Sequence, residues 1–249
     1  MLVMRSLLFH AFQLVTVVPW ALLCLLWAPA PLSWRYRFTV FWPRMVIAAA
    51  RVLVGIRHEV RGLHNLPDAP VILLSKHQST WETLFFPSYL PRELCYVFKR
   101  ELLYLPFFGW GIGLLKMIHI DRRRGGDAFE QMVAQGTRKL AEGRSIIIFP
   151  EGTRTRPGSQ GRYRSGGTRL AVRTGAAIVP IAVNSGELWP RKALVLRPGT
   201  ITVSIGAPIA PAGREADSLR SEVEGWIEAE MRRLSPHRYA RGQPAGSSA

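Results

Sequence analysis

Short apolar runs alternate with helix-length segments along most of this chain, and this alternation restricts the fold more than any other feature. The runs that predict strands are residues 71–75, 94–98, 117–120, 145–149, 177–183, 193–196 and 201–205. Helices are predicted to begin near Thr80, Gly126 and Gly166, and a last helix to cover residues 215–234, where apolar residues recur at helical spacing. Strands that alternate with helices are typical of an α/β fold.

The N-terminus is more apolar than the rest. Residues 6–28 carry no formal charge, and a helix of that length can cross a hydrocarbon core of about 30 Å. A cleaved signal peptide would have a shorter apolar core, so we expect a permanent anchor. A second apolar stretch, residues 38–54, contains Arg44 and Arg51, which lie seven residues apart and share a helical face. This pattern favours an interfacial helix or the second arm of a hairpin.

The chain is therefore divided into an N-terminal membrane-binding helical segment (1–57), an α/β domain (58–234) and a polar, disordered tail (235–249). Only Arg5 precedes the first apolar stretch, whereas six arginines follow it: Arg35, Arg37, Arg44, Arg51, Arg57 and Arg61. The positive-inside rule then places the domain on the cytoplasmic side of a membrane, the inner or plasma membrane.

The net charge indicates an anionic partner. There are 33 Lys+Arg against 17 Asp+Glu, a formal charge of +16, which attracts nucleic acid, anionic lipid or phosphorylated substrates. The Arg-rich loops lack the interleaved aromatic residues of a single-strand binder, so we expect anionic membrane lipids and no nucleic acid. Cys24 and Cys95 have no metal-ligand or redox spacing and are predicted to be buried thiols in a reducing compartment.

The first candidate site lies between a predicted strand and a predicted helix, in the sequence Ser75-Lys76-His77-Gln78-Ser79-Thr80-Trp81-Glu82. If Ser79 or Thr80 caps the helix, Glu82 falls in its first turn and His77 in the tight turn before it. A carboxylate that accepts from one ring nitrogen fixes the tautomer and raises the basicity of the other, as a general base requires. The same spacing also fits a capping histidine beside an ordinary first-turn acid.

The second candidate site, Phe149-Pro150-Glu151-Gly152-Thr153-Arg154-Thr155, follows another predicted strand. Gly152 permits a sharp turn, and Arg154 can bind a phosphate through two parallel hydrogen bonds. A third segment, residues 117–124, carries Arg122 as a second candidate phosphate ligand. Taken alone, each segment also fits a solvated basic loop.

Other catalytic patterns are missing from the sequence: there is no Gly-x-Ser-x-Gly elbow, no Walker loop, no Gly-x-Gly-x-x-Gly fingerprint and no His/Cys set at zinc spacing. We therefore predict no metal and no cofactor. Direct acyl transfer between two bound substrates fits such a chain.

Four sequence blocks, in order, resemble those of the 1-acyl-sn-glycerol-3-phosphate (lysophosphatidic acid) acyltransferases, over residues 60–208. They are His77 to Glu82 for the His-x4-Asp block, residues 99–122, the FPEGTRT of residues 149–155, and the VPIAV of residues 179–183. The resemblance implies a mixed α/β sheet flanked by helices, preceded by a helical segment that seats the domain in the bilayer.

The resemblance also implies roles for individual residues. His77 would be the general base on the free acceptor hydroxyl, and Glu82 would hold and polarise it. Arg122, Glu151, Gly152, Thr153 and Arg154 would bind the glycerol phosphate. The donor would be an acyl-CoA or acyl carrier protein thioester, attacked without a covalent enzyme intermediate, and the product phosphatidic acid.

Two positions depart from the family pattern. Glu82 stands where the family usually has Asp, and Lys76 where it usually has Asn before the histidine. A cation that pointed the same way as His77 would lower the proton affinity of the ring. Three alternatives stay open: another lyso-lipid acceptor, a hydrolase in which His77 activates water, and a non-catalytic basic binding protein.

Overall fold

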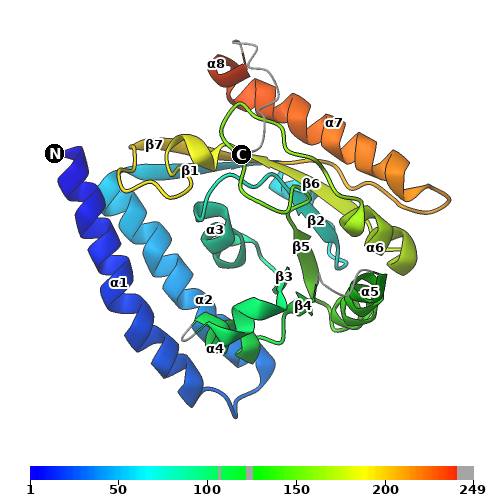
Figure 1. The fold of residues 1–249 in the computed structure, drawn as a ribbon, viewed down its shortest axis with the longest axis horizontal. Coiled ribbons are helices and arrows are strands. Elements are labelled where there is room, and N and C mark those ends of the chain that lie inside the picture. Colours follow the sequence, from blue (N-terminus) through cyan, green and yellow to red (C-terminus); the bar gives the residue numbers. More distant parts are fainter. Residues whose placement is uncertain (106–107, 122–125, 240–249) are drawn as a thin grey trace.

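The computed structural model describes residues 1–105, 108–121 and 126–239. Within them, seven strands form one sheet in the order β1-β7-β6-β2-β5-β3-β4 (Figure 1). The strands are β1 Ile56–Arg61, β2 Ile72–Ser75, β3 Leu94–Lys99, β4 Ile118–Ile120, β5 Ser145–Ile148, β6 Ile178–Val183 and β7 Gly199–Ile205. Neighbours pair in parallel except β6 and β7, which are antiparallel. The predicted mixed α/β sheet is confirmed.

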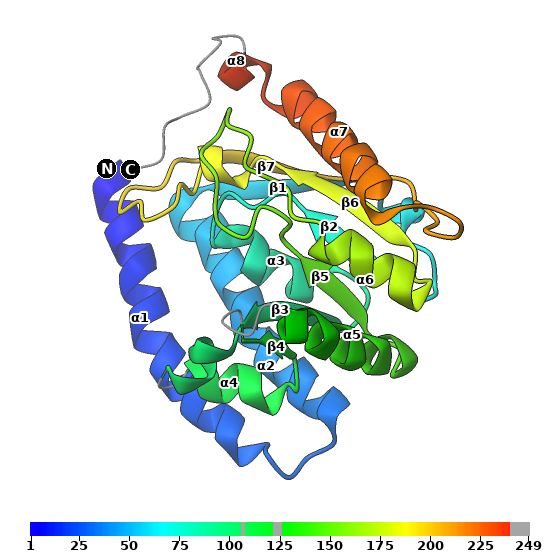
Figure 2. The same ribbon diagram turned by 45° about the vertical axis from the view of Figure 1, so that its right-hand side comes forward.

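Helices cover both faces of the sheet (Figures 1 and 2). They are α1 Leu2–Leu26, α2 Leu32–Ala49, α3 Trp81–Tyr89, α4 Phe108–Leu114, α5 Gly126–Ala141, α6 Gly166–Thr174, α7 Ala216–Leu234 and α8 Pro236–Tyr239, with a π-helix at Ala50–Val54 and short 3₁₀ segments Leu63–Asn65, Arg100–Tyr104 and Ser185–Glu187. Because side chains alternate along a strand, Leu73 of β2 packs in the core beneath α1–α3, whereas Ile72 and Leu74 pack beneath α5–α7.

Helices α1 and α2 form an antiparallel hairpin along one side of the molecule (Figure 2). Trp20 stacks on Phe38 with ring centroids 4.6 Å apart, and Trp42 Nε1 donates to Thr16 Oγ1 at 3.0 Å. The second apolar stretch is therefore the second arm of a hairpin, and it begins earlier than expected, at Leu32.

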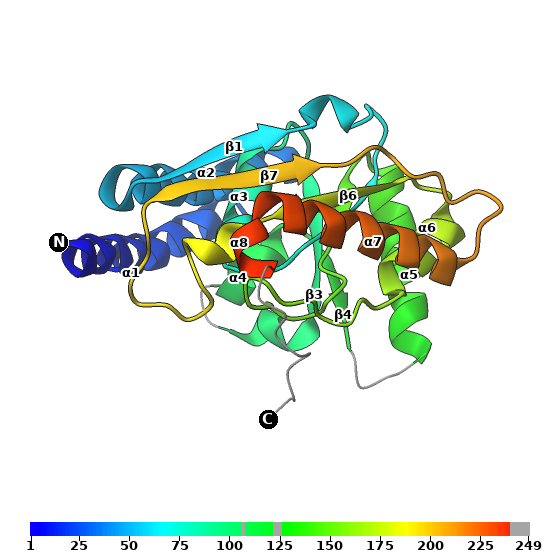
Figure 3. The same ribbon diagram turned by 90° about the horizontal axis from the view of Figure 1, so that it is seen from above.

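Two strand predictions were wrong. Residues 193–196 form no strand. Their backbone bonds α1 instead, since Leu196 N donates to Ser6 Oγ at 3.0 Å and the oxygen of Leu194 lies 3.1 Å from His10 Nε2. Strand β1 was missed, because only one of its faces is apolar (IRHEVR). It lies at the edge of the sheet and pairs with β7 alone (Figure 3).

The predicted helices are close to the observed ones, whereas α4 was not expected. The division at residue 57 stays a prediction, although it falls inside β1. Helix α8 occupies the first part of the segment 235–249 that we predicted to be disordered, and residues 240–249 lie outside the described residues.

Candidate active site

His77 and Glu82 meet at the carboxyl end of β2. The chain leaves β2 at Ser75, turns, and starts α3 at Trp81, with Thr80 in the N-cap position and Glu82 in the first turn. The turn is held by Ser79, whose hydroxyl accepts from Trp81 N at 2.9 Å. This turn brings Glu82 Oε1 to 2.9 Å from His77 Nδ1, the first of the two arrangements that the spacing allowed.

The Glu82 carboxylate is fully buried and fully bonded. Besides His77, Oε1 accepts from the backbone N–H groups of Gln78 and Ser79, both at 2.7 Å. Oε2 accepts from the hydroxyl of Ser185 at 2.6 Å, which reaches it from the loop after β6. Glu82 therefore bonds the His77 ring and, at the same time, the backbone at the start of α3, as a capping acid does.

This geometry decides which nitrogen of His77 can take a proton. A carboxylate facing Nδ1 requires Nδ1 to carry the hydrogen, so the lone pair lies on Nε2. No hydrogen bond from the described residues reaches Nε2. The ring stacks on Phe149, with centroids 3.9 Å apart and 15° between the planes, and its side chain is 13% exposed. The His77 ring is therefore held in one orientation, with Nε2 unengaged by the described residues.

The second candidate segment lies beside His77, because β5, which precedes it, is the parallel neighbour of β2. Gly152 adopts φ +68°, the sharp turn that the sequence predicts. Thr155 N donates to the oxygen of His77 at 2.8 Å. The Glu151 carboxylate is buried and accepts from His77 N at 3.1 Å, so it contacts the backbone of the base.

Arg154 lies on the same side as Glu82. Its Nε donates to the oxygen of Ser79 at 3.0 Å, and no hydrogen bond from the described residues engages its two terminal nitrogens. Burial lowers the pKa of the Arg154 guanidinium, the Glu82 carboxylate opposes this shift, and Arg191 adds to it. The side chain is thus anchored next to the His77–Glu82 pair with donors left for an anion.

The structure places the other predicted residues as follows. Thr153 is exposed at the turn, and Arg122 lies outside the described residues. Lys76 points away from the His77 ring, because its ammonium lies 2.7 Å from Glu228 Oε1 on α7, on the opposite face of the sheet. Ser185 and Glu228 were missed, since nothing near them in sequence marks them as partners of the first candidate site.

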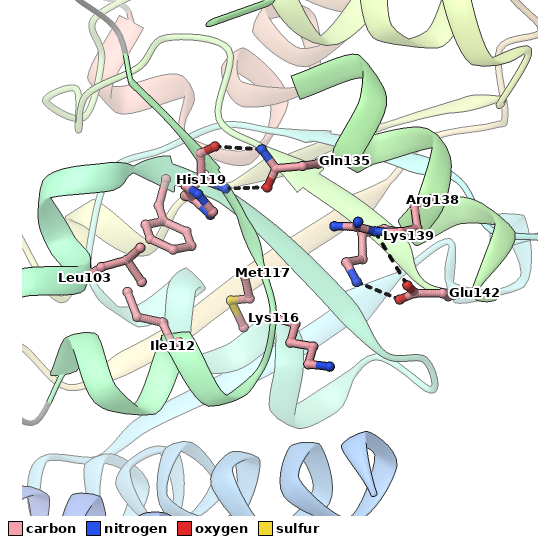
Figure 4. Close-up of a pocket in the computed structure, with 11 residues that line it drawn as sticks. Leu103, Ile112, Lys116, Met117, His119, Gln135, Arg138, Lys139 and Glu142 are labelled. Atoms are coloured by element: carbon pink, nitrogen blue, oxygen red, sulfur yellow. Dashed lines mark hydrogen bonds and ion pairs between the residues drawn. The ribbon is translucent and has the colours of Figure 1, made fainter. Parts of the chain in front are cut away.

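A pocket of about 470 Å³ lies along the free edge of β4 (Figure 4). Phe98, Leu103 and Met117 supply part of its apolar wall. The amide of Gln135 bonds both the N–H and the oxygen of His119, and so covers the backbone of this edge strand. Three inter-strand steps, about 14 Å, separate β4 from β2. The pocket is therefore distinct from the site around His77.

Known proteins are similar to this chain in sequence and in fold. The Acyltransferase family model matches residues 57–184. A protein of Pseudomonas aeruginosa named 1-acyl-sn-glycerol-3-phosphate acyltransferase is 44% identical over 237 residues, 93% of this chain and 92% of that protein. The mouse 1-acyl-sn-glycerol-3-phosphate acyltransferase alpha is 33% identical over 71% of this chain and 63% of its own length.

A crystal structure shares the fold: the 1-acyl-sn-glycerophosphate (LPA) acyltransferase PlsC of Thermotoga maritima superposes with a TM-score of 0.77 at 22% identity, covering 97% of this chain and 98% of that one. The mixed sheet of this chain agrees with that fold. The chain belongs to the 1-acyl-sn-glycerol-3-phosphate acyltransferase family.

Proposed function

We propose that this protein transfers an acyl chain from acyl-CoA or acyl carrier protein to the free sn-2 hydroxyl of 1-acylglycerol-3-phosphate, giving phosphatidic acid for phospholipid biosynthesis. The observation that carries the proposal is the 2.9 Å contact between His77 Nδ1 and the buried Glu82 carboxylate. The names of the relatives from Pseudomonas aeruginosa and mouse support the choice of acceptor.

In this mechanism His77 Nε2 accepts the proton of the acceptor hydroxyl while the hydroxyl oxygen bonds to the thioester carbonyl carbon. The carbon–sulfur bond then breaks, and the proton passes from Nε2 to the leaving thiolate, so an ester and a free thiol are formed. A thioester is already activated, so base catalysis and positioning of two substrates supply most of what the protein must add. The mechanism uses no metal and no cofactor.

Arg154 is the residue we assign to the acceptor phosphate, together with Gly152 and Thr153 of the same turn and with Arg122. The bond from Arg154 Nε to Ser79 fixes the guanidinium close to Glu82. A phosphate held there keeps the glycerol beside His77. Since Glu151 is bonded by protein groups, we assign it to the support of His77 rather than to contact with the phosphate.

The test is an assay of purified protein with a panel of lyso-lipids and both donor types. Wild type is expected to prefer lysophosphatidate. Arg154→Ala should raise the KM for lysophosphatidate by about 10- to 100-fold, the cost of one charge-assisted hydrogen-bonded contact, with little change in kcat. For acceptors without a phosphate monoester, Arg154→Ala should raise the KM less.

Arg156→Ala is the matched control, because Arg156 is exposed in the same loop. An Arg154→Ala effect confined to the KM of the thioester would reassign Arg154 to the donor. If wild type prefers a different lyso-lipid, that lipid is the acceptor instead of lysophosphatidate. If wild type consumes the thioester without any acceptor, the protein is a hydrolase.

The hairpin of α1 and α2 is proposed to dock on an anionic membrane, with the domain on its cytoplasmic side. Helix α1 is apolar and long enough to cross a bilayer. It also packs on the domain along its first half, where Phe9 is buried and meets Trp189 edge-on at 5.1 Å. A helix held against its own domain in this way fits docking in one leaflet.

We expect a Leu14→Asp/Val15→Asp variant to lose most of its co-sedimentation with anionic vesicles. These side chains are 73% and 70% exposed on α1, and charges there oppose insertion. The variant should still acylate a water-soluble, short-chain acceptor. Val172→Asp, on α6 at the other face of the sheet, is the control and should bind vesicles like wild type. Unchanged sedimentation of the double variant would refute this docking face.

A further inference from the structure

The Lys76 side chain is completely buried, and its three donor protons meet three acceptors. Nζ lies 2.7 Å from Glu151 Oε1, 2.7 Å from Glu228 Oε1 and 3.1 Å from the oxygen of Ser159. An ammonium has three donors and no acceptor, so this arrangement satisfies it entirely. Lys76 is thus the centre of a buried ionic cluster, next in sequence to the proposed base.

Glu151 connects that cluster to His77. Its Oε1 accepts from Lys76 and from Gly161 N at 3.2 Å, and its Oε2 accepts from His77 N at 3.1 Å and from Thr155 Oγ1 at 3.4 Å. Because Thr155 also bonds the oxygen of His77, both backbone polar groups of His77 are held by this loop. The orientation of the imidazole therefore depends on where Glu151 is fixed.

Glu228 brings helix α7 into the cluster. It lies on α7, 2% exposed, and its Oε1 also accepts from the hydroxyl of Tyr163 at 2.8 Å. Burial raises the pKa of Tyr163 above its usual range, and the carboxylates of Glu151 and Glu228 add to the shift, so this hydroxyl keeps its proton and stays a donor. Figure 3 shows α7 lying across the sheet above β6.

We propose that Lys76 and Glu228 are positioning residues of the acyl transfer. Glu228 of α7 holds the Lys76 ammonium, and the ammonium fixes the Glu151 carboxylate. Glu151 in turn holds the backbone of His77, and so orients Nε2 toward the acceptor hydroxyl. This inference rests on the proposed function. It also gives a role to the lysine that stands where the family usually has asparagine. Neither side chain touches a substrate, because both are buried on the face of the sheet opposite to α3.

The charges of the cluster make its members interdependent. Two carboxylates share one buried ammonium, so removing Lys76 leaves two like charges close together without a counterion. Removing the charge of Glu228 leaves the Lys76–Glu151 pair intact but takes away the charge that ties Lys76 to α7. The first change is therefore expected to be more severe.

The experiment is a double-mutant cycle on the purified full-length protein, with kcat, both KM values and Tm measured for each variant. Lys76→Met should lower kcat by about 100-fold, the effect of a misplacement near 1 Å, and Glu228→Gln by about 10-fold, with both KM values within about twofold of wild type. In Lys76→Met/Glu228→Gln the repulsion is relieved, so Tm should rise above that of Lys76→Met. Its kcat should stay as low.

That separation of kcat from Tm is what a purely structural role would not produce. Recovery of kcat together with Tm in the double variant, or effects on kcat that simply multiply, would overturn the inference. So would a wild-type kcat in Glu228→Gln, the milder variant. Glu222→Gln, an exposed glutamate of the same helix paired with Arg214, is the control and should match wild type.

A His77→Ala variant separates this failure from failure of the proposed function. If it loses transfer while the Lys76 and Glu228 variants keep wild-type kcat, only the positioning inference falls. If it keeps transfer, His77 is not the base, and the positioning inference falls with that role. No transfer to lysophosphatidate by the wild-type protein would instead refute the proposed function.

Discussion

Replacing His77 with alanine is expected to lower acyl transfer to lysophosphatidate by about 10³-fold, within the range that general base catalysis supplies. The reason is that Glu82 fixes the hydrogen of the His77 ring on Nδ1 and so leaves a lone pair on Nε2, which can accept the proton of the acceptor hydroxyl. Initial rates of thiol release with saturating donor and acceptor measure the effect. Binding to anionic vesicles should not change, because the His77 side chain contacts Glu82 and Phe149 and not the exposed face of α1.

His64→Ala is the matched control, because His64 is exposed in the 3₁₀ segment before β2, and it should transfer like wild type. His77→Gln serves as a second variant, because it keeps a polar side chain against Phe149 if the alanine variant proves unstable. Wild-type rates from purified His77→Ala protein would contradict the mechanism.

Replacing Glu82 with glutamine is expected to lower kcat by about 10²- to 10⁴-fold, as loss of the orienting anion does in other base-catalysed acyl transfers. The amide keeps the volume of the side chain but removes the negative charge that holds the Nδ1 hydrogen and stabilises the protonated ring. In the wild type, Glu82 Oε1 and Oε2 accept from Gln78, Ser79 and Ser185. The glutamine amide would place its own N–H donors against some of these donors. Circular dichroism and Tm would show whether the fold persists.

Glu82→Asp is expected to keep kcat within about tenfold of wild type, because the resemblance implies that the turn can hold Asp at this position. The shorter side chain should give up Ser185, which Glu82 reaches at 2.6 Å. Ser185→Ala should therefore lower kcat slightly when it is the only change, and should not lower kcat further in the Glu82→Asp variant. Full loss of activity in Glu82→Asp would mean that the extra methylene is essential here.

The parts of the site that sequence could predict are those set by local geometry. His77 and Glu82 are five residues apart, and a strand-to-helix turn brings them together wherever the domain lies. Phe149 to Thr155 could be predicted as a second loop at the carboxyl end of a strand, but its contact with His77 could not. The parallel pairing of β2 with β5 supplies that contact.

The parts that sequence could not predict depend on distant segments. Ser185 lies 103 residues beyond Glu82, and Glu228 lies 152 residues beyond Lys76, so no spacing rule connects them. The same reason explains the incorrect strand at residues 193–196, whose backbone bonds the distant helix α1 while Leu194 and Val195 stay exposed. Strand β1 was missed because an edge strand with one buried face has too weak an alternation to stand out.

The pairing of β1 with β7 fixes the order of events during synthesis. Ile56 lies opposite Gly199, so the first strand of the sheet has no partner until nearly the whole chain has been translated. At the usual 5–20 residues per second, the apolar α1–α2 hairpin leaves the ribosome roughly 10 s before that partner exists. The hairpin can therefore meet the bilayer while the sheet is still open. If the hairpin docks as proposed, the nascent chain reaches its membrane before the sheet is complete.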